Sequence, residues 1–270
     1  MEFKRLIRMA LPIAVASFFS YTFGPVSIAF CGRLGKTELA TIGLAMSIFN
    51  MAGLFATSGL LTASDTMFSQ TYGSKMRYKI SIQLKRSLAV ITICCIPCCA
   101  LYMCIEPVLL ILGQNPQISQ LTSGFLLRLI PALFFAAWGQ VLTRYVQNQN
   151  HLYAPLLFNM LTNGVNALLH YIFLFQLHMG LNGSAFAQTM AYLFQAVCFF
   201  IYICFSKKIV KFNAENTCEF LEDWGSWLRL AIPGLVMVSL ESTLFELGGL
   251  VAGEFSAGKC LPFARSRYSE

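Results

Sequence analysis

The N-terminal stretch Leu6-Ile7-Arg8-Met9-Ala10-Leu11-Pro12 returns late in the chain as Trp227-Leu228-Arg229-Leu230-Ala231-Ile232-Pro233. Both stretches begin an apolar run with an arginine, and a proline follows four residues later; at the same offset of 221 residues, Gly32 matches Gly253. Proline costs little in the first turn of a helix, so each stretch is typical of a helix start. The match predicts one structural unit over residues 6–226 and a second beginning at residue 227. Chance similarity between two apolar helices is the alternative.

The composition of the chain excludes an ordinary soluble domain. Of its 270 residues, 57% are hydrophobic and 11% are charged, whereas soluble domains carry about 25% charged residues. In a soluble protein the net charge of +7 would suggest a nucleic-acid partner, but here the charges gather between apolar runs, where membrane topology explains them. We therefore expect an integral membrane protein that contacts lipid and no nucleic acid.

Seven apolar runs reach the length of about 20 residues that a helix needs to cross a bilayer. They cover residues 9–30, 39–64, 86–112, 121–145, 155–176, 183–205 and 228–252. In the segments that connect them, thirteen Lys and Arg residues fall on the side of the N-terminus and five on the other, which places the N-terminus in the cytoplasm. The sequence thus predicts an all-α polytopic membrane protein with about seven transmembrane helices.

The repeat divides these helices into three parts. Residues 1–226 hold the first six-span repeat, residues 227–253 the first helix of a second repeat, and residues 254–270 a divergent polar tail without an apolar run. Internal repeats of this kind are typical of secondary transporters.

Polar side chains at helical spacing run along three of the spans. Such stripes serve either interhelical hydrogen bonds, worth about 0.6 kcal/mol each, or the wall of a water-accessible cavity. Because they recur on three spans, a cavity is favoured. Its expected wall comprises Asn159, Asn163, Asn166 and His170 in the fifth span and Gln188 and Gln195 in the sixth, with a further stripe of Gln140, Thr143, Arg144 and Gln147 in the fourth. The small residues of the first span, among them Ser17, Ser20 and Gly24, indicate close helix packing instead.

Two acids lie at membrane depth in the seventh span, where an ionisable group is costly and usually functional. Glu241 stands almost at the middle of the run, and Glu246 follows five residues later on a different face. A carboxylate at this depth suits reversible protonation and the binding of an organic cation. The alternative for Glu241 is a structural ion pair or a neutral, hydrogen-bonded acid.

Other chemistry has little support in the residues. The C-x-x-C spacing within Cys94-Cys95-Ile96-Pro97-Cys98-Cys99 lies inside a span and has no second pair of ligands, so we expect no metal site. No phosphate-binding G-x-x-x-x-G-K-[ST] loop and no catalytic arrangement of histidines are present. The sequence therefore predicts neither an enzyme nor a bound cofactor.

Several motifs, in their order along the chain, resemble those of the multidrug and toxic compound extrusion (MATE) family, in detail those of its animal members. They are AFCGRLGK at 29–36, SDT at 64–66, SQTYGS at 69–74, IPA at 130–132, NGVNAL at 163–168 and WGSWLRLAIP at 224–233. The resemblance implies two six-helix lobes with a cavity between them, and antiport of protons, or of sodium in some bacterial branches, against organic cations and other drug-like molecules. The proton would be the coupling ion.

The resemblance also implies roles for particular residues. Glu241 looks like the seventh-span glutamate that binds substrate or proton in animal members, with Glu246 as its companion. Asn50 matches a position linked to transport, and Cys31 and Cys95 match positions linked to thiol sensitivity.

The resemblance ends at Gly253, after which no further span follows. We therefore expect an incomplete, C-terminally truncated form of a multi-pass transporter, with the plasma membrane as the family default. The alternative is a truncated protein that does not transport but binds or regulates a full-length transporter.

Overall fold

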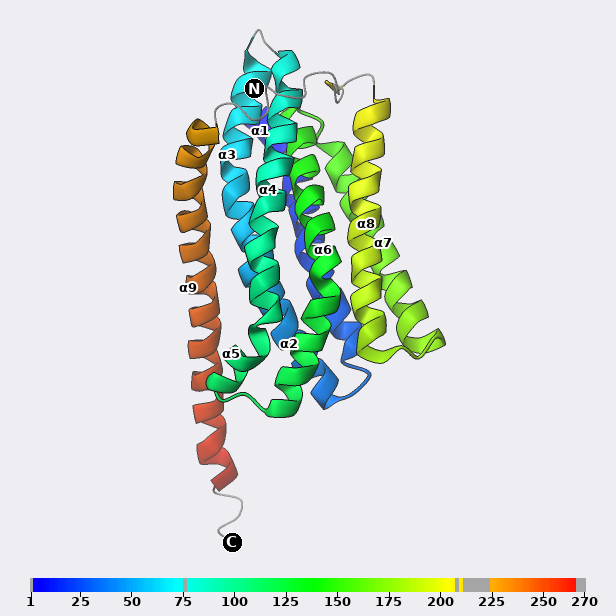
Figure 1. Ribbon diagram of the computed structural model, residues 1–270, viewed down its shortest axis with the longest axis vertical. Helices are drawn as coiled ribbons and strands as arrows, with labels where there is room; N and C mark the ends of the chain where they lie inside the picture. The colour runs from blue at the N-terminus through cyan, green and yellow to red at the C-terminus, as the bar shows by residue number, and fades with distance from the viewer. Residues whose placement is uncertain (1, 75–76, 207–208, 211–223, 266–270) are drawn as a thin grey trace.

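The computed structural model describes residues 2–74, 77–206, 209–210 and 224–265, and within these ranges the chain forms helices and no strand (Figure 1). The α-helices are α1 (Glu2–Cys31), α2 (Lys36–Ile48), α3 (Phe55–Gly73), α4 (Ile80–Met103), α5 (Ile105–Ile111), α6 (Pro116–Asn148), α7 (Tyr153–Tyr171), α8 (Gly180–Phe205) and α9 (Trp224–Arg265). The predicted all-α fold class is confirmed.

Among the described residues, six helical segments are long and apolar enough to cross a membrane: Ala10–Cys31, Lys36–Gly73, Ile80–Met103, Pro116–Asn148, Gly180–Phe205 and Trp224–Leu244. The remaining predicted run, 155–176, which is the fifth along the chain, forms α7 and a π-helical turn, Ile172–Gln176. It falls outside the set because three asparagines and His170 make α7 less apolar than the other long helices. The same polar residues that predicted a cavity thus set α7 apart.

The second membrane segment is one continuous rod interrupted by a wider turn. Between α2 and α3 the residues Phe49–Leu54 form a π-helix. The buried Tyr102 of α4 donates its hydroxyl to the Phe49 carbonyl oxygen at 3.1 Å, which satisfies a backbone acceptor in this irregular turn. Asn50, one of the predicted binding residues, lies in this turn.

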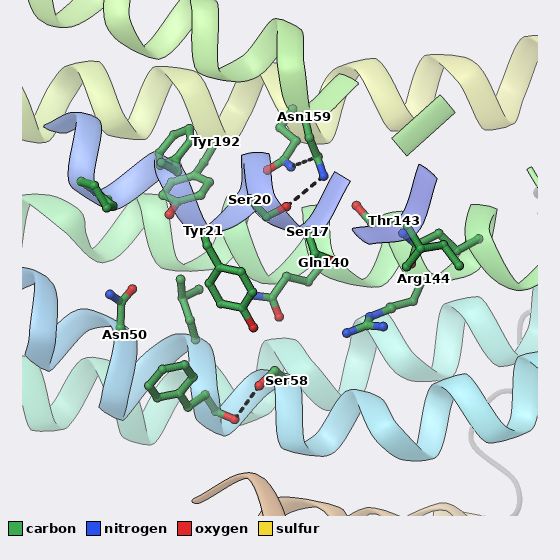
Figure 2. A pocket seen from close by; sticks show the side chains of 18 of the residues that line it. Ser17, Ser20, Tyr21, Asn50, Ser58, Gln140, Thr143, Arg144, Asn159 and Tyr192 are labelled. Carbon is green, nitrogen blue, oxygen red and sulfur yellow. Dashed lines mark hydrogen bonds between the residues drawn. The ribbon is translucent and has the colours of Figure 1, made fainter. Parts of the chain in front are cut away.

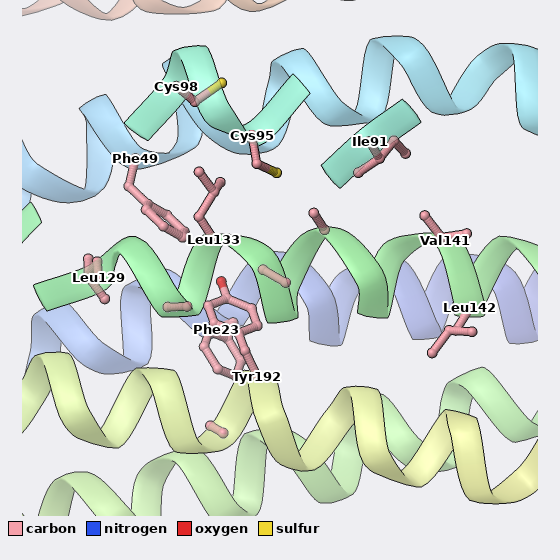
Figure 3. Packing of buried hydrophobic residues seen from close by; sticks show 14 of the residues in the cluster. Phe23, Phe49, Ile91, Cys95, Cys98, Leu129, Leu133, Val141, Leu142 and Tyr192 are labelled. Carbon is pink, nitrogen blue, oxygen red and sulfur yellow. The ribbon is translucent and has the colours of Figure 1, made fainter. Parts of the chain in front are cut away.

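Helix α6 forms the centre of the bundle, between α4 and α8 (Figure 3). It begins where the Asn115 side chain accepts a hydrogen bond from the Gln117 amide at 2.9 Å, with Pro116 at the first helical position. Its buried residues include Leu129, Leu133 and Val141, which pack against Phe49, Ile91 and Cys95. Most of the side chains that fix the relative positions of the helices therefore converge on α6.

Helix α9 lies against α3, to which it runs antiparallel (Figure 1). Two glycines make the crossing close: a Cβ added at Gly59 would lie 2.7 Å from the Leu235 Cα, and one added at Gly234 would collide with the Thr62 hydroxyl. Trp227 and Ala231 are fully buried beside this crossing. Because side chains are absent at both glycines, the backbones approach as they do at small-residue interfaces in membranes.

Helix α9 continues beyond the predicted end of the seventh span. The sequence predicts a polar tail from residue 254, whereas the structure extends the helix to Arg265. A helix is compatible with the polar composition of this segment, so the division of the chain at residue 254 stays a prediction.

Candidate functional site

A pocket of about 290 Å³ lies between α1, the α2–α3 rod, α6, α7 and α8 (Figure 2). Its polar wall consists of Ser17, Ser20, Tyr21, Asn50, Ser58, Gln140, Thr143, Arg144, Gln147, Asn159, Tyr192 and Gln195. Aromatic and apolar side chains complete the lining, including Phe23, Phe55 and Met46. A mixture of amides, hydroxyls and aromatic faces around a concave space is typical of a small-molecule site.

Asn159 joins three helices at the floor of this pocket. Its side-chain NH2 donates to the Ala16 carbonyl oxygen at 3.1 Å and to the Ser20 hydroxyl at 2.9 Å, both on α1. Its carbonyl oxygen accepts a hydrogen bond of 2.9 Å from the Gln195 side chain on α8. The amide is therefore held in one orientation, with Gln195 beside it on the pocket wall.

Replacing Asn159 is expected to loosen this junction. An Asn159→Ala variant loses three hydrogen bonds, each worth about 0.6 kcal/mol in a membrane bundle, so we expect a loss of about 2 kcal/mol in stability. Thermal unfolding in detergent measures the change. Met160→Ala, at a neighbouring exposed position of α7, serves as the control and should unfold close to the unmodified chain. Equal midpoints for the two variants would contradict the assigned junction.

The predicted cavity residues divide into two groups. Asn50, Asn159 and Gln195 line the pocket, and Asn163 lines a smaller pocket that adjoins it. Asn166, His170 and Gln188 line neither pocket and are fully buried in helix contacts instead.

Helix α1 causes this division by covering the second half of the α7 stripe. Asn166 donates to the Phe23 carbonyl oxygen of α1 at 3.4 Å. His170 Nδ1 donates to the Asn166 carbonyl oxygen at 2.8 Å, so its Nε2 accepts from the Ser184 hydroxyl at 3.0 Å. These residues occupy the interhelical hydrogen-bonding role that was the alternative for the stripe, while Asn159 combines both roles.

Glu241 is an exposed residue of α9 and lines neither described pocket. It follows Gly234 by seven residues, about two helical turns, so both project from the same side of α9. Gly234 sits against Thr62, and two turns before Thr62 the antiparallel α3 presents Phe55, which lines the pocket. This register places Glu241 at about the level of Phe55 along the bundle.

Three other predicted residues lie elsewhere. Cys31 and Cys95 are fully buried, so a thiol reagent reaches them only when the helices separate. The side chain of Glu246 lies outside the described residues. Among the residues that the structure describes, no group of three or more His, Cys, Asp or Glu side chains is placed to hold a metal ion.

Two sets of pocket residues were not among the predicted site residues. Ser17, Ser20 and Gly24 were assigned to close packing, but all three line the pocket. Their spacing alone cannot distinguish close helix packing from a place on the pocket wall, because small side chains leave room either for a neighbouring helix or for a cavity. Tyr21 carries no periodic signal and would have been found only by knowing which face of α1 the α7 amides contact.

Known proteins are similar to this chain in sequence. The MatE family model matches residues 12–172. Multidrug and toxin extrusion protein 1 of Mus musculus and that of Homo sapiens are each 35% identical to this chain over 252 residues. The match covers 93% of this chain and 44% of either relative, so the chain spans less than half of their length.

Solved structures show the same arrangement of helices. The crystal structure of the eukaryotic MATE transporter AtDTX14 superposes with a TM-score of 0.87 at 27% identity, covering 93% of this chain and 56% of that one. A crystal structure of a MATE protein in the bent conformation gives a TM-score of 0.75 at 16% identity over 85% of this chain and 51% of that one, which shows the shared fold alone.

Proposed function

This chain belongs to the MATE family, and from that membership we propose that it forms the first six-helix lobe, with the first helix of the second lobe, of a proton-coupled antiporter that exports organic cations and drug-like molecules. The names of its animal relatives, which are multidrug and toxin extrusion proteins, support the substrate class. The residues of the pocket supply the chemistry.

The observation that carries the proposal is a pocket walled by aromatic side chains and neutral amides. The lining includes Tyr21, Phe55 and the stacked pair of Phe23 and Tyr192, with ring centroids 4.4 Å apart, and we propose that Glu241, level with Phe55 along the bundle, supplies the carboxylate. Organic cations bind to aromatic faces and to carboxylates, and neutral amides can adapt to their remaining polar groups. A site of this kind favours cationic over anionic molecules.

Antiport follows when the proton and the organic cation compete for the carboxylate of Glu241. When Glu241 is ionised it pairs with a cation, and when it is protonated it loses that attraction, so proton and cation exclude one another. Rocking of the two lobes around the pocket would expose Glu241 to each side of the membrane in turn. A proton gradient then drives cation release on the side where Glu241 gains its proton.

We also propose that the end of the bundle holding the start of α1 and the start of α9 faces the cytoplasm, at the plasma membrane. Basic residues gather at this end, including Arg77, Lys79 and Lys85 at the α3–α4 connection and Arg144 near the end of α6. Cytoplasmic connections carry this excess of Lys and Arg in multi-pass proteins.

The test is pH-gradient-driven exchange of a fluorescent organic cation in vesicles that contain this chain alone. We expect binding of the cation but little or no exchange, because alternation needs a second lobe and the relatives are more than twice as long as the matched region. Membrane insertion is confirmed by protease protection. Rapid exchange by the chain alone would contradict the two-lobe requirement, and absence of cation binding would contradict the proposed function.

A further inference from the structure

An ion pair joins α3 to α6 at one end of the pocket. Arg144 Nη1 lies 3.4 Å from Asp65 Oδ2, and the Asn148 side chain donates to Asp65 Oδ1 at 2.9 Å. The same Asn148 NH2 donates to the Arg144 carbonyl oxygen at 2.9 Å. Asp65 is thus held by an α6 arginine and by an asparagine one turn later, both of which it faces from α3.

Arg144 also belongs to the pocket wall. Figure 2 shows it at the opposite end of the pocket from Asn50, and it is the one charged side chain among the described residues that line this space. Its position near the end of α6 places it at the basic end of the bundle, the end proposed to face the cytoplasm. A cation entering from the cytoplasm would therefore pass a guanidinium group before it reaches Glu241.

The positive charge of Arg144 would hinder the entry of organic cations into the pocket, and Asp65 can neutralise that charge. An unpaired positive charge on the wall repels an entering cation, and because protein surrounds the pocket this repulsion is screened less than in bulk water. A carboxylate in contact with the guanidinium turns the local field into that of a neutral dipole. We propose that Asp65 is a specificity-determining residue that neutralises Arg144 at the entrance of the pocket and so makes the pocket accessible to organic cations.

A purely structural role explains the pair less well. Side-chain exposures of 47% for Arg144 and 32% for Asp65 leave the pair in a partly solvated position, where ion pairs contribute little to stability. The helices are already joined nearby by buried contacts, such as the T-shaped pair of Phe68 on α3 and Tyr145 on α6, whose ring centroids are 5.5 Å apart. The electrostatic effect on the pocket is then the larger consequence of the pair.

The inference rests on the proposed function. Binding measurements on the unmodified chain and three variants distinguish failure of the inference from failure of the proposed function. The complete 270-residue chain, Asp65→Asn, Arg144→Gln and the double variant are placed in lipid nanodiscs at low ionic strength. Each is titrated with a fluorescent quaternary ammonium probe and with its uncharged carbon isostere. Asparagine at position 65 can still accept the hydrogen bond from Asn148, so the helix contact is retained.

We expect Asp65→Asn to weaken binding of the cation about tenfold, to leave binding of the isostere within about twofold, and to lose most of its effect at high salt. The double variant should bind the cation about as tightly as the unmodified chain, because no guanidinium remains to be neutralised. If Asp65→Asn binds the cation normally, or loses both probes without recovery in the double variant, the inference is wrong while the proposed function stands. If the unmodified chain binds no cation, the proposed function itself fails, and the inference fails with it.

Discussion

A Glu241→Gln variant is expected to bind a fluorescent organic cation at least tenfold more weakly than the unmodified chain. The side chain keeps its size and hydrogen-bonding groups but loses the charge that pairs with the cation, and a charge-assisted contact is worth about 1.5–3 kcal/mol. Equilibrium titrations of both forms with the same probe measure the difference in affinity.

Glu106→Gln provides the matched control, because Glu106 lies on α5 and outside both described pockets. It should leave cation affinity unchanged. In any assembly in which the chain supports exchange, Glu241→Gln should abolish that exchange. Normal exchange by this variant across a range of pH would show that another group carries the proton and the cation.

A Gly234→Val variant is expected to separate α9 from α3 and to lower the unfolding midpoint by about 5–10 °C. The added Cβ would collide with the Thr62 hydroxyl and lie 2.9 Å from the Gly59 carbonyl oxygen, so the backbones must move apart. Overpacking of this kind costs about 1–3 kcal/mol. Because Trp227 is buried at the same contact, its fluorescence emission should move to longer wavelength.

Gly225→Ala tests whether the effect belongs to the crossing. Gly225 lies on the same helix, and a Cβ added there meets nothing within 4 Å. Alanine is also the better helix former, so this variant should be as stable as the unmodified chain or slightly more stable. If the Gly234→Val and Gly225→Ala variants have the same unfolding midpoint, α9 does not depend on close contact with α3. Glu241 would then lose the register that places it level with Phe55.

The two glycines also show where prediction from sequence stops. The match between residues 6–12 and 227–233 predicts that a helix begins again near residue 227, and α9 begins at Trp224. Nothing in that match indicates that Gly234 meets Thr62 of α3, because the contact joins residues far apart in the chain. The level of Glu241 along the bundle, near that of Phe55, depends on this crossing.

The α7 amides show the same limit within a single helix. Their spacing correctly indicates one polar face, but Asn159 lines the pocket while Asn166 and His170 are buried against α1 and α8. Periodicity reports which residues share a face and carries no information on the angle at which a neighbouring helix crosses it. For the same reason the serines of α1 could be assigned to packing from sequence, although they line the pocket.

The sequence by itself determined the all-α membrane fold and the extent of most of its spans, because insertion into a bilayer depends on the hydrophobicity of about 20 consecutive residues, which is a local property. The motifs in their order also identified the family. Only the tertiary structure decided which polar side chains form the pocket, that Arg144 on its wall is paired with Asp65, and that Gly234 of α9 meets Thr62 of α3. Those relations depend on how distant helices pack, and packing is settled by the fit of many side chains and close backbone approaches at once.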